Sequence, residues 1–168
     1  MNEIFDVVDE HDTVVGRASR SEVHGNPALI HRVAHVLVFN RHGDLYLQRR
    51  VLNKDVQPGK WDTSVGGHVD AGEKYDSAAV RELAEELGVT GITPEFLWKY
   101  LHRNDYESEY VCTYRIQFDG DISYDPVEIM DGRFWKIIEI DENLGTGIFT
   151  PNFEDEYRQF LGQGRLNT

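Results

Sequence analysis

The segment DSAAVRELAEEL (76–87) restricts the fold of this chain more than any other part of the sequence. Its apolar residues recur at helical spacing and predict one stripe that packs on a core: Val80, Leu83, Ala84 and Leu87. Asp76 is the expected N-cap, and Gly88 is expected to end the helix. Three carboxylates share the other face, namely Glu82, Glu85 and Glu86. Like charges at this spacing weaken a helix, so this face either binds a cation or is an ordinary solvated surface.

The residues around this helix extend the pattern over GHVDAGEKYDSAAVRELAEELGV (67–89). Gly67 is followed six positions later by Glu73 and eight positions after that by Arg81, which directly precedes the three glutamates. This arrangement resembles the Nudix box, a glycine-led loop–helix–loop of pattern G-x5-E-x7-R-E-U-x-E-E-x-G-U, in which U is a bulky aliphatic residue. Every fixed position of the pattern is present in these 23 residues.

The resemblance implies the Nudix fold, of α/β (α+β) class, with a mixed β-sheet sandwiched between α-helices. It implies that the carboxylates of Glu82, Glu85 and Glu86 bind Mg²⁺ or Mn²⁺, which prefer oxygen ligands. Such a cation can bridge to the diphosphate oxygens of a substrate and activate a water molecule. Arg81 would orient one of the carboxylates and Glu73 would brace the loop. The general base is either Glu85 or Glu86, and the sequence leaves that choice open.

The residues before the box, QRRVLNKDVQPGKWDTSVGGHV (48–69), resemble the matching stretch of type I isopentenyl-diphosphate isomerases, a branch of the same superfamily. Those enzymes carry a second metal site made of three histidines and two glutamates. Counterparts in this chain are His24, His31, His68, Glu107 and Glu109. Such a mixed set suits a second divalent metal, Zn²⁺, Mn²⁺ or Mg²⁺. The alternative for each histidine is a surface or hydrogen-bonded residue.

This chain departs from the isomerase pattern at the position of the catalytic cysteine. The isomerases have W-T-N-S-V-C-G-H, whereas WDTSVGGH (61–68) has Gly66 at the cysteine position. Glycine has no side-chain proton to transfer, and the single thiol of the chain, Cys112, is predicted on another strand. The predicted function is therefore metal-dependent hydrolysis of a diphosphate linked to another moiety, such as a nucleoside diphosphate derivative. The alternatives are an isomerase-like enzyme and a non-catalytic ligand-binding module.

Three basic residues before the box are candidates to neutralise the diphosphate: Arg49, Arg50 and Lys54. The alternative for each of them is a cross-strand or surface ion pair. Trp61 is expected in the core rather than stacked on a ligand. Glu128, in a segment that precedes an aromatic-rich strand, is a further candidate to approach the metal.

The other segments predict strands and helices in mixed order, as in a sheet flanked by helices, within one domain over residues 1–168. Residues 1–30 form an N-terminal extension with a hairpin over 3–20 followed by a short helix. A second hairpin over 32–51 turns at Gly43. Strands are expected at 94–103, 110–118 and 133–138, and a helix at 152–162.

The composition limits the classes of partner that the protein is expected to bind. The chain has 17 Lys and Arg against 30 Asp and Glu, a net charge of −13 and a pI near 4.8. Such a surface repels phosphate backbones, so a nucleic acid polymer is not an expected partner. No apolar run reaches membrane-spanning length, and the amino terminus lacks signal-peptide features, which predicts a cytoplasmic protein. A small-molecule diphosphate is the expected partner, and homodimers are common in such families; neither the substrate nor the oligomeric state can be read from the sequence.

Overall fold

The computed structural model describes residues 3–54 and 56–163. These residues form two compact units, which we call the first unit (within 1–37 and 65–116) and the second unit (within 38–64 and 117–168). The expectation of one domain over 1–168 stays a prediction, as do the cytoplasmic location and the homodimer. Among the described residues, no helix is long and apolar enough to cross a lipid bilayer.

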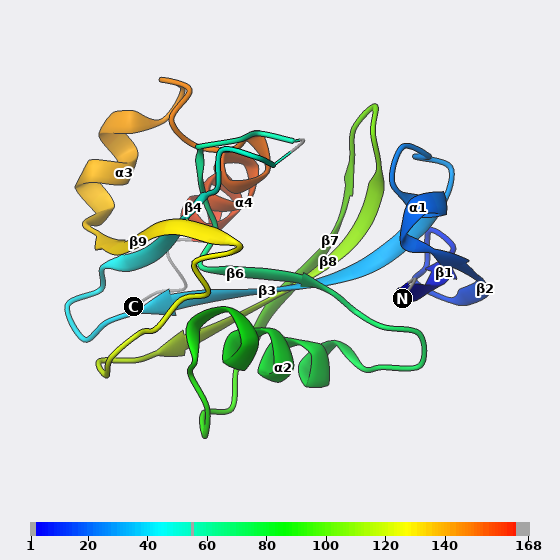
Figure 1. The fold of residues 1–168 in the computed structure, drawn as a ribbon, viewed down its shortest axis with the longest axis horizontal. Coiled ribbons are helices and arrows are strands. Elements are labelled where there is room, and N and C mark those ends of the chain that lie inside the picture. The colour runs from blue at the N-terminus through cyan, green and yellow to red at the C-terminus, as the bar shows by residue number, and fades with distance from the viewer. Residues whose placement is uncertain (1–2, 55, 164–168) are drawn as a thin grey trace. The chain divides into compact units, whose positions relative to one another are not determined.

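In the first unit, β3 is antiparallel to both β1 and β6 (Figure 1). Its strands are β1 (Ile4–Val8), β2 (Val14–Ser19), β3 (Ile30–Phe39, as far as residue 37), β6 (Val65–His68), β7 (Glu95–Arg103) and β8 (Ser108–Gln117, as far as residue 116). β3 pairs with β1, β6 and β8, while β2 and β7 extend the sheet beyond β1 and β8. The predicted hairpin over 3–20 is confirmed as β1 and β2, and the short helix that follows is α1 (Arg20–Val23).

Helix α2 (Tyr75–Leu87) packs against β6 in the first unit (Figure 1). Its buried residues are Ala78, Ala79, Leu83 and Leu87. The predicted stripe was wrong at Val80, whose surface is 47% exposed, because the small alanines at 78 and 79 are buried instead. The helix also begins one residue early: Lys74 is the N-cap, and Asp76 lies in the first turn, where the helix dipole still favours a carboxylate. Gly88 ends the helix in the left-handed conformation, as predicted.

The turn between β1 and β2 is fixed to the rest of the first unit by one carboxylate. Asp12 adopts a positive φ of 62°, and its carboxylate is almost completely buried. Arg32 Nε donates to it from β3 at 2.7 Å, Lys99 Nζ from β7 at 2.8 Å and Tyr75 Oη from α2 at 2.9 Å. Burial alone would raise the pKa of Asp12, but these hydrogen bonds outweigh it and hold the pKa below its ordinary value. Three elements are thus tied to one turn residue.

Replacing Asp12 with asparagine is expected to lower the free energy of unfolding by about 2 kcal/mol at pH 7. Asparagine tolerates the positive φ, so the change removes the charge and leaves the backbone conformation accessible. Because the pKa of Asp12 is depressed in the folded state, its stabilisation is present above the ordinary pKa of 3.8 and disappears as the pH falls through the folded value. Urea unfolding of both proteins should therefore differ at pH 7 and converge at low pH.

Glu10→Gln is the matched control, because Glu10 forms an exposed ion pair with Arg103 in the same turn region. We expect its effect to stay within about 0.5 kcal/mol. Equal stability of D12N and E10Q at pH 7 would contradict the role given to Asp12.

The second unit combines three strands with two helices. These are β4 (Leu45–Arg50), β5 (Trp61–Asp62), β9 (Ile129–Trp135), α3 (Ile137–Asn143) and α4 (Pro151–Gly162). β4 lies between β5 and β9 and is antiparallel to both. Aromatic side chains form the interior, in a chain of ring contacts through Trp135, Phe149, Phe153, Tyr157 and Phe160. Thr150 caps α4 by accepting from the Phe153 amide at 3.1 Å, so the predicted helix over 152–162 is confirmed with one extra residue.

The second unit confirms one sequence expectation and contradicts another. As predicted for residues 32–51, β3 and β4 are antiparallel and joined by a turn through Gly43, with Phe39 opposite Leu45. The strand expected over 133–138 ends at Trp135. The Lys136 amide donates to the Glu139 side chain at 3.1 Å, which starts α3 at the next residue.

Candidate metal-binding site

Helix α2 presents three carboxylates on one face, as the spacing predicted. Their surroundings differ. The Glu82 side chain is 14% exposed, whereas that of Glu85 is 58% exposed and Glu86 is half-buried. Burial raises the pKa of the Glu82 carboxyl above its ordinary value, against the effect of the nearby Arg81 guanidinium. A partly buried carboxylate of this kind gains most from a cation that neutralises it.

Arg81 joins the carboxylates to the loop before the helix. Its Nε and Nη2 donate to the two oxygens of Glu73 at 2.9 and 2.8 Å, in a bidentate pair that lowers the pKa of Glu73. Nη1 donates to Glu82 at 2.8 Å and to Glu85 at 3.3 Å. Nη2 also donates to the backbone oxygen of His68 at 3.0 Å. One guanidinium therefore holds the loop, the end of β6 and two candidate metal ligands in a fixed relation.

Gly67, the first residue of the box, lies where the Glu82 side chain crosses β6. A Cβ atom at position 67 would collide with the Cγ, Cδ and Oε1 atoms of Glu82. The glycine is required here by space rather than by its backbone angles. It lets the carboxyl group of α2 lie directly against the strand.

A second cluster lies in the same unit and contains all five residues that the sequence suggested. His24 follows α1, His31 lies on β3, His68 ends β6, Glu107 directly precedes β8, and Glu109 is the second residue of β8. The ligand atoms of the three histidines all lie within 4.8 Å of one another, and so do those of His31, Glu107 and Glu109. That these residues bind a metal stays a prediction.

Contacts within this His/Glu cluster are close. Nε2 of His24 lies 3.2 Å from Nε2 of His68 and 3.5 Å from a Glu107 oxygen. His31 is fully buried, and neither of its ring nitrogens has a hydrogen-bond partner among the described residues. The ring of Phe5 stacks on those of His68 and His31, with centroids 4.7 and 5.8 Å apart. Sequence reasoning missed Phe5, which the alternating pattern of β1 marks only as a core residue.

Burial disfavours the charged form of the histidines in this cluster. It lowers the pKa of His31 to about 4 and that of His68 well below its ordinary value. A neutral imidazole has a lone pair for a metal ion. His31 belongs to both triads of ligand atoms, one with His24 and His68 and the other with Glu107 and Glu109, and such a mixture of imidazole and carboxylate donors suits a divalent transition metal.

The NUDIX domain family model matches residues 29–153 of the chain, which include the box and its carboxylates. The chain belongs to the Nudix family. A protein of Streptomyces coelicolor named as an uncharacterized Nudix hydrolase is 37% identical over 153 residues, which cover 90% of this chain and 84% of that protein. Isopentenyl-diphosphate Delta-isomerase 1 of Photorhabdus laumondii is 28% identical, with 92% and 93% covered.

A crystal structure from Deinococcus radiodurans resembles this Nudix hydrolase with a TM-score of 0.82 and 26% identity, covering 94% of this chain and 98% of the other. The α+β Nudix fold and the hydrolase class predicted from the box are thereby confirmed. The resemblance to the isomerase branch is also confirmed at the level of sequence.

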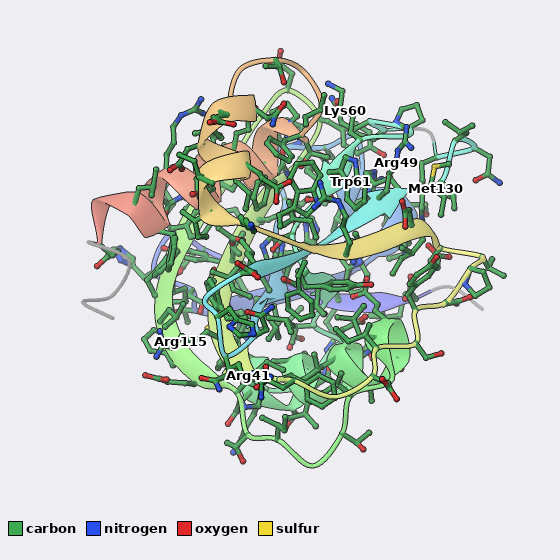
Figure 2. All side chains as sticks on the ribbon, turned by 90° about the vertical axis from the view of Figure 1, so that its left-hand side faces the viewer. Arg41, Arg49, Lys60, Trp61, Arg115 and Met130 are labelled. Carbon is green, nitrogen blue, oxygen red and sulfur yellow. The ribbon has the colours of Figure 1, made fainter. Side chains whose placement is uncertain are left out.

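The basic residues expected to bind the diphosphate all belong to the second unit of the Nudix fold and have partners within it. Arg49 Nε donates to the Gly59 oxygen at 2.8 Å, and Arg50 Nε donates to the Val56 oxygen at 3.0 Å. Arg49 lies opposite Trp61 in the pairing of β4 with β5 (Figure 2). Lys54 forms an ion pair with Glu128 at 2.5 Å. Their role as substrate ligands stays a prediction, as does the approach of Glu128 to a metal.

Trp61 is also in the second unit, half-buried, and it packs edge-on against Trp135 with ring centroids 5.2 Å apart. The Arg133 guanidinium lies over both rings, at 5.8 Å from Trp61 and 3.7 Å from Trp135. Trp61 therefore contacts the buried Trp135 but is only half-buried itself, and its assignment to the core stays a prediction.

Cys112 does not replace the cysteine that is missing at Gly66. Successive residues of β8 point to opposite faces, so Cys112 and Glu109 lie on opposite sides of the strand. Cys112 is buried, and burial raises the pKa of its thiol, which disfavours the thiolate. In the first unit the thiol is therefore separated from the His/Glu cluster by the sheet itself.

Proposed function

We propose that this Nudix hydrolase cleaves a diphosphate linked to another moiety, with Mg²⁺ or Mn²⁺ held by Glu82, Glu85 and Glu86. The observation that carries the proposal is the single guanidinium of Arg81, which binds Glu73, Glu82 and Glu85 at once. A surface helix of solvated glutamates has no need of such a fixed arrangement. A site that must hold a cation at a defined place does.

The residues fit a hard divalent cation. Their donors are carboxylate oxygens at positions i, i+3 and i+4 of one helix. Gly67 leaves room for the Glu82 carboxyl, and the buried position of that carboxyl favours a nearby positive charge. When bound, the cation would neutralise charge on the diphosphate and lower the pKa of a water molecule.

The protein side chains have separate tasks in this proposal. Arg81 fixes the direction of Glu82, and Glu73 fixes Arg81 through its bidentate pair. Glu85 or Glu86 accepts the proton of the attacking water, and Glu85 is the more exposed of the two. The water oxygen bonds to one phosphorus, the bond from that phosphorus to the bridging oxygen breaks, and the bridging oxygen leaves with the other phosphate, so that each product carries one phosphate.

The test is to incubate the protein with Mg²⁺ and a panel of diphosphates that includes isopentenyl diphosphate, and to follow ³¹P and ¹H NMR. We expect new monophosphate signals from at least one compound, and no reaction after chelation of the metal. A shifted alkene pattern with intact phosphorus would overturn the proposal in favour of isomerisation.

Isomerisation is the second candidate, because the His/Glu cluster matches the metal set of the isomerase branch and an isomerase of Photorhabdus laumondii is among the relatives. Gly66 argues against it, because this position offers no acid or base. The complete set of box glutamates favours hydrolysis.

We also propose that His24, His31, His68, Glu107 and Glu109 bind a second divalent metal, and that Zn²⁺ suits the three imidazoles best. The support comes from His31, which is buried with both ring nitrogens lacking a hydrogen-bond partner in the described part of the chain. Buried polar atoms of this kind are costly unless something binds them.

Zn²⁺ is expected to raise the melting temperature of the metal-stripped protein, because a ligand at 100 times its Kd stabilises the folded state by about 2.7 kcal/mol. His31→Gln should lose this increase, since it removes the central imidazole. His102→Gln is the control, because His102 lies outside the cluster and makes a long contact with Asn104. Differential scanning calorimetry of the three proteins with and without Zn²⁺ gives the result, and an equal increase in all three would contradict the site.

A further inference from the structure

We propose that His68 couples the two metal sites, so that a divalent cation in the His/Glu cluster tightens the binding of a second cation at the box carboxylates. This inference rests on the proposed function, because it assumes that both sites bind metal. It adds that a cation in one site tightens the binding of a cation in the other, and it assigns this effect to His68.

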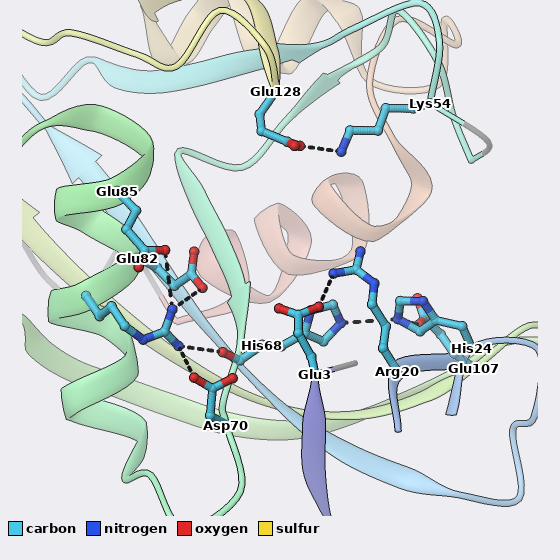
Figure 3. A network of polar contacts seen from close by, with 11 residues as sticks. Glu3, Arg20, His24, Lys54, His68, Asp70, Glu82, Glu85, Glu107 and Glu128 are labelled. Carbon is cyan, nitrogen blue, oxygen red and sulfur yellow. Dashed lines mark hydrogen bonds and ion pairs between the residues drawn. The ribbon is translucent and has the colours of Figure 1, made fainter. Parts of the chain in front are cut away.

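His68 takes part in both sites through different atoms (Figure 3). Its ring nitrogen Nε2 lies 3.2 Å from His24 Nε2, inside the His/Glu cluster. Its backbone oxygen accepts a hydrogen bond from Arg81 Nη2 at 3.0 Å. The ring and the backbone oxygen belong to the same residue, so a force that fixes the ring also restricts the position of that oxygen.

Arg81 connects the His68 backbone oxygen to the carboxylates of the box. The guanidinium that binds the His68 oxygen also donates to Glu82 at 2.8 Å and to Glu85 at 3.3 Å. The residue before His68 is Gly67, against which the Glu82 side chain lies. A change at the end of β6 therefore reaches Glu82 by two routes, one through Arg81 and one through direct contact with the strand.

β6 is paired with β3 over its whole length, with Val33 opposite His68 at one end and Val36 opposite Val65 at the other. The Val69 amide donates to the Arg32 oxygen at 3.0 Å. A metal in the cluster can still fix two things, the rotation of the His68 ring and the tilt of the His68 peptide group.

The sign of the coupling separates this mechanism from simple electrostatics. Two dications in one unit repel each other, so charge alone would make the second cation bind more weakly. A cation that orders His68 removes conformational freedom that the second cation would otherwise have to remove, and the second then binds more tightly. Tighter binding thus points to the structural route.

The experiment uses the metal-stripped full-length protein. Calorimetry with Zn²⁺ first gives the concentration that fills one site, and Mn²⁺ binding is then followed by loss of the free Mn²⁺ signal in electron paramagnetic resonance, with and without that Zn²⁺. We expect Zn²⁺ to lower the Kd for Mn²⁺ by about fivefold or more. An unchanged or raised Kd would overturn the coupling.

Two matched variants test the role of His68. His24→Gln and His68→Gln each remove one imidazole from the cluster and leave the backbone oxygen of residue 68 in place. With Zn²⁺ raised until one site is filled, H24Q should still show the tightening and H68Q should lose it. The same response in both variants would overturn the assignment to His68. If H68Q does not fold, the comparison in the natural sequence and in H24Q still decides whether coupling exists.

Failures of the two underlying sites can be told apart. If Zn²⁺ does not bind in calorimetry, the second metal site is wrong and the coupling is overturned with it. If Mn²⁺ does not bind in the absence of Zn²⁺ or in its presence, the box site of the proposed function is wrong, and the coupling is again overturned.

Discussion

Replacing Glu86 with glutamine is expected to lower kcat/KM for diphosphate hydrolysis by about 10³-fold in Mg²⁺. Glu86 shares the face of α2 with Glu82 and Glu85, and glutamine keeps its size while removing the negative charge. The loss has two physical sources, a weaker site for the cation and the removal of one of the two candidate bases. The measurement is steady-state hydrolysis of whichever diphosphate the panel identifies, over a range of Mg²⁺ concentrations.

The control for this variant lies on the same helix. Asp76→Asn removes one negative charge from the first turn of α2, on the N-terminal side of the carboxylate face. We expect its activity to stay within a few-fold of the natural protein, because long-range charge effects at an exposed site are screened. Hydrolysis by E86Q at the natural rate would show that the proposed metal site is wrong.

Gly67→Ala is expected to lower kcat/KM by about 10²-fold while changing the free energy of unfolding by no more than about 1–2 kcal/mol. The new methyl group would occupy the space of the Glu82 side chain. Because the atoms that it meets belong to a flexible side chain and not to backbone, Glu82 can move away at little cost in stability. The value of kcat/KM falls instead, because the displaced carboxylate leaves both Arg81 and the cation site.

Gly16→Ala is the matched control for this change. Gly16 lies in β2, and a Cβ atom there would meet nothing within 4 Å in the described part of the chain. Activity and urea unfolding of both variants should be measured together. If G67A and G16A had equal activity, the contact between position 67 and Glu82 would have no part in catalysis.

The sequence predicted the residues of the box because a helix has a fixed period. Once residues 76–87 were assigned to a helix, Glu82, Glu85 and Glu86 had to share a face, and the structure has them so. The five residues of the His/Glu cluster come from four separate segments. No local period relates His24 to Glu109, so only the resemblance to the isomerases suggested that they meet.

Other features depend on contacts that a sequence does not display. The meeting of Gly67 with Glu82 requires that α2 crosses β6 at one particular point. The burial of Val80 was wrongly predicted, because periodicity gives the stripe of a helix but not its rotation toward two alanines. The strand expected to extend to Ile138 stopped early, because the capping contact of Lys136 with Glu139 outweighed the β preference of two isoleucines.

The hydrogen bonds of Asp12 determine how much of the N-terminal segment can be removed from this protein. The family match begins at residue 29, yet Asp12 binds side chains of β3, β7 and α2 from a turn well before that point. A version shortened to the matched range would leave Arg32 and Lys99 without their shared carboxylate, and would lack the ring of Phe5 and the imidazole of His24. The segment before the matched range is thus a structural part of the first unit, and expression of a minimal catalytic fragment should keep the chain from β1 onward.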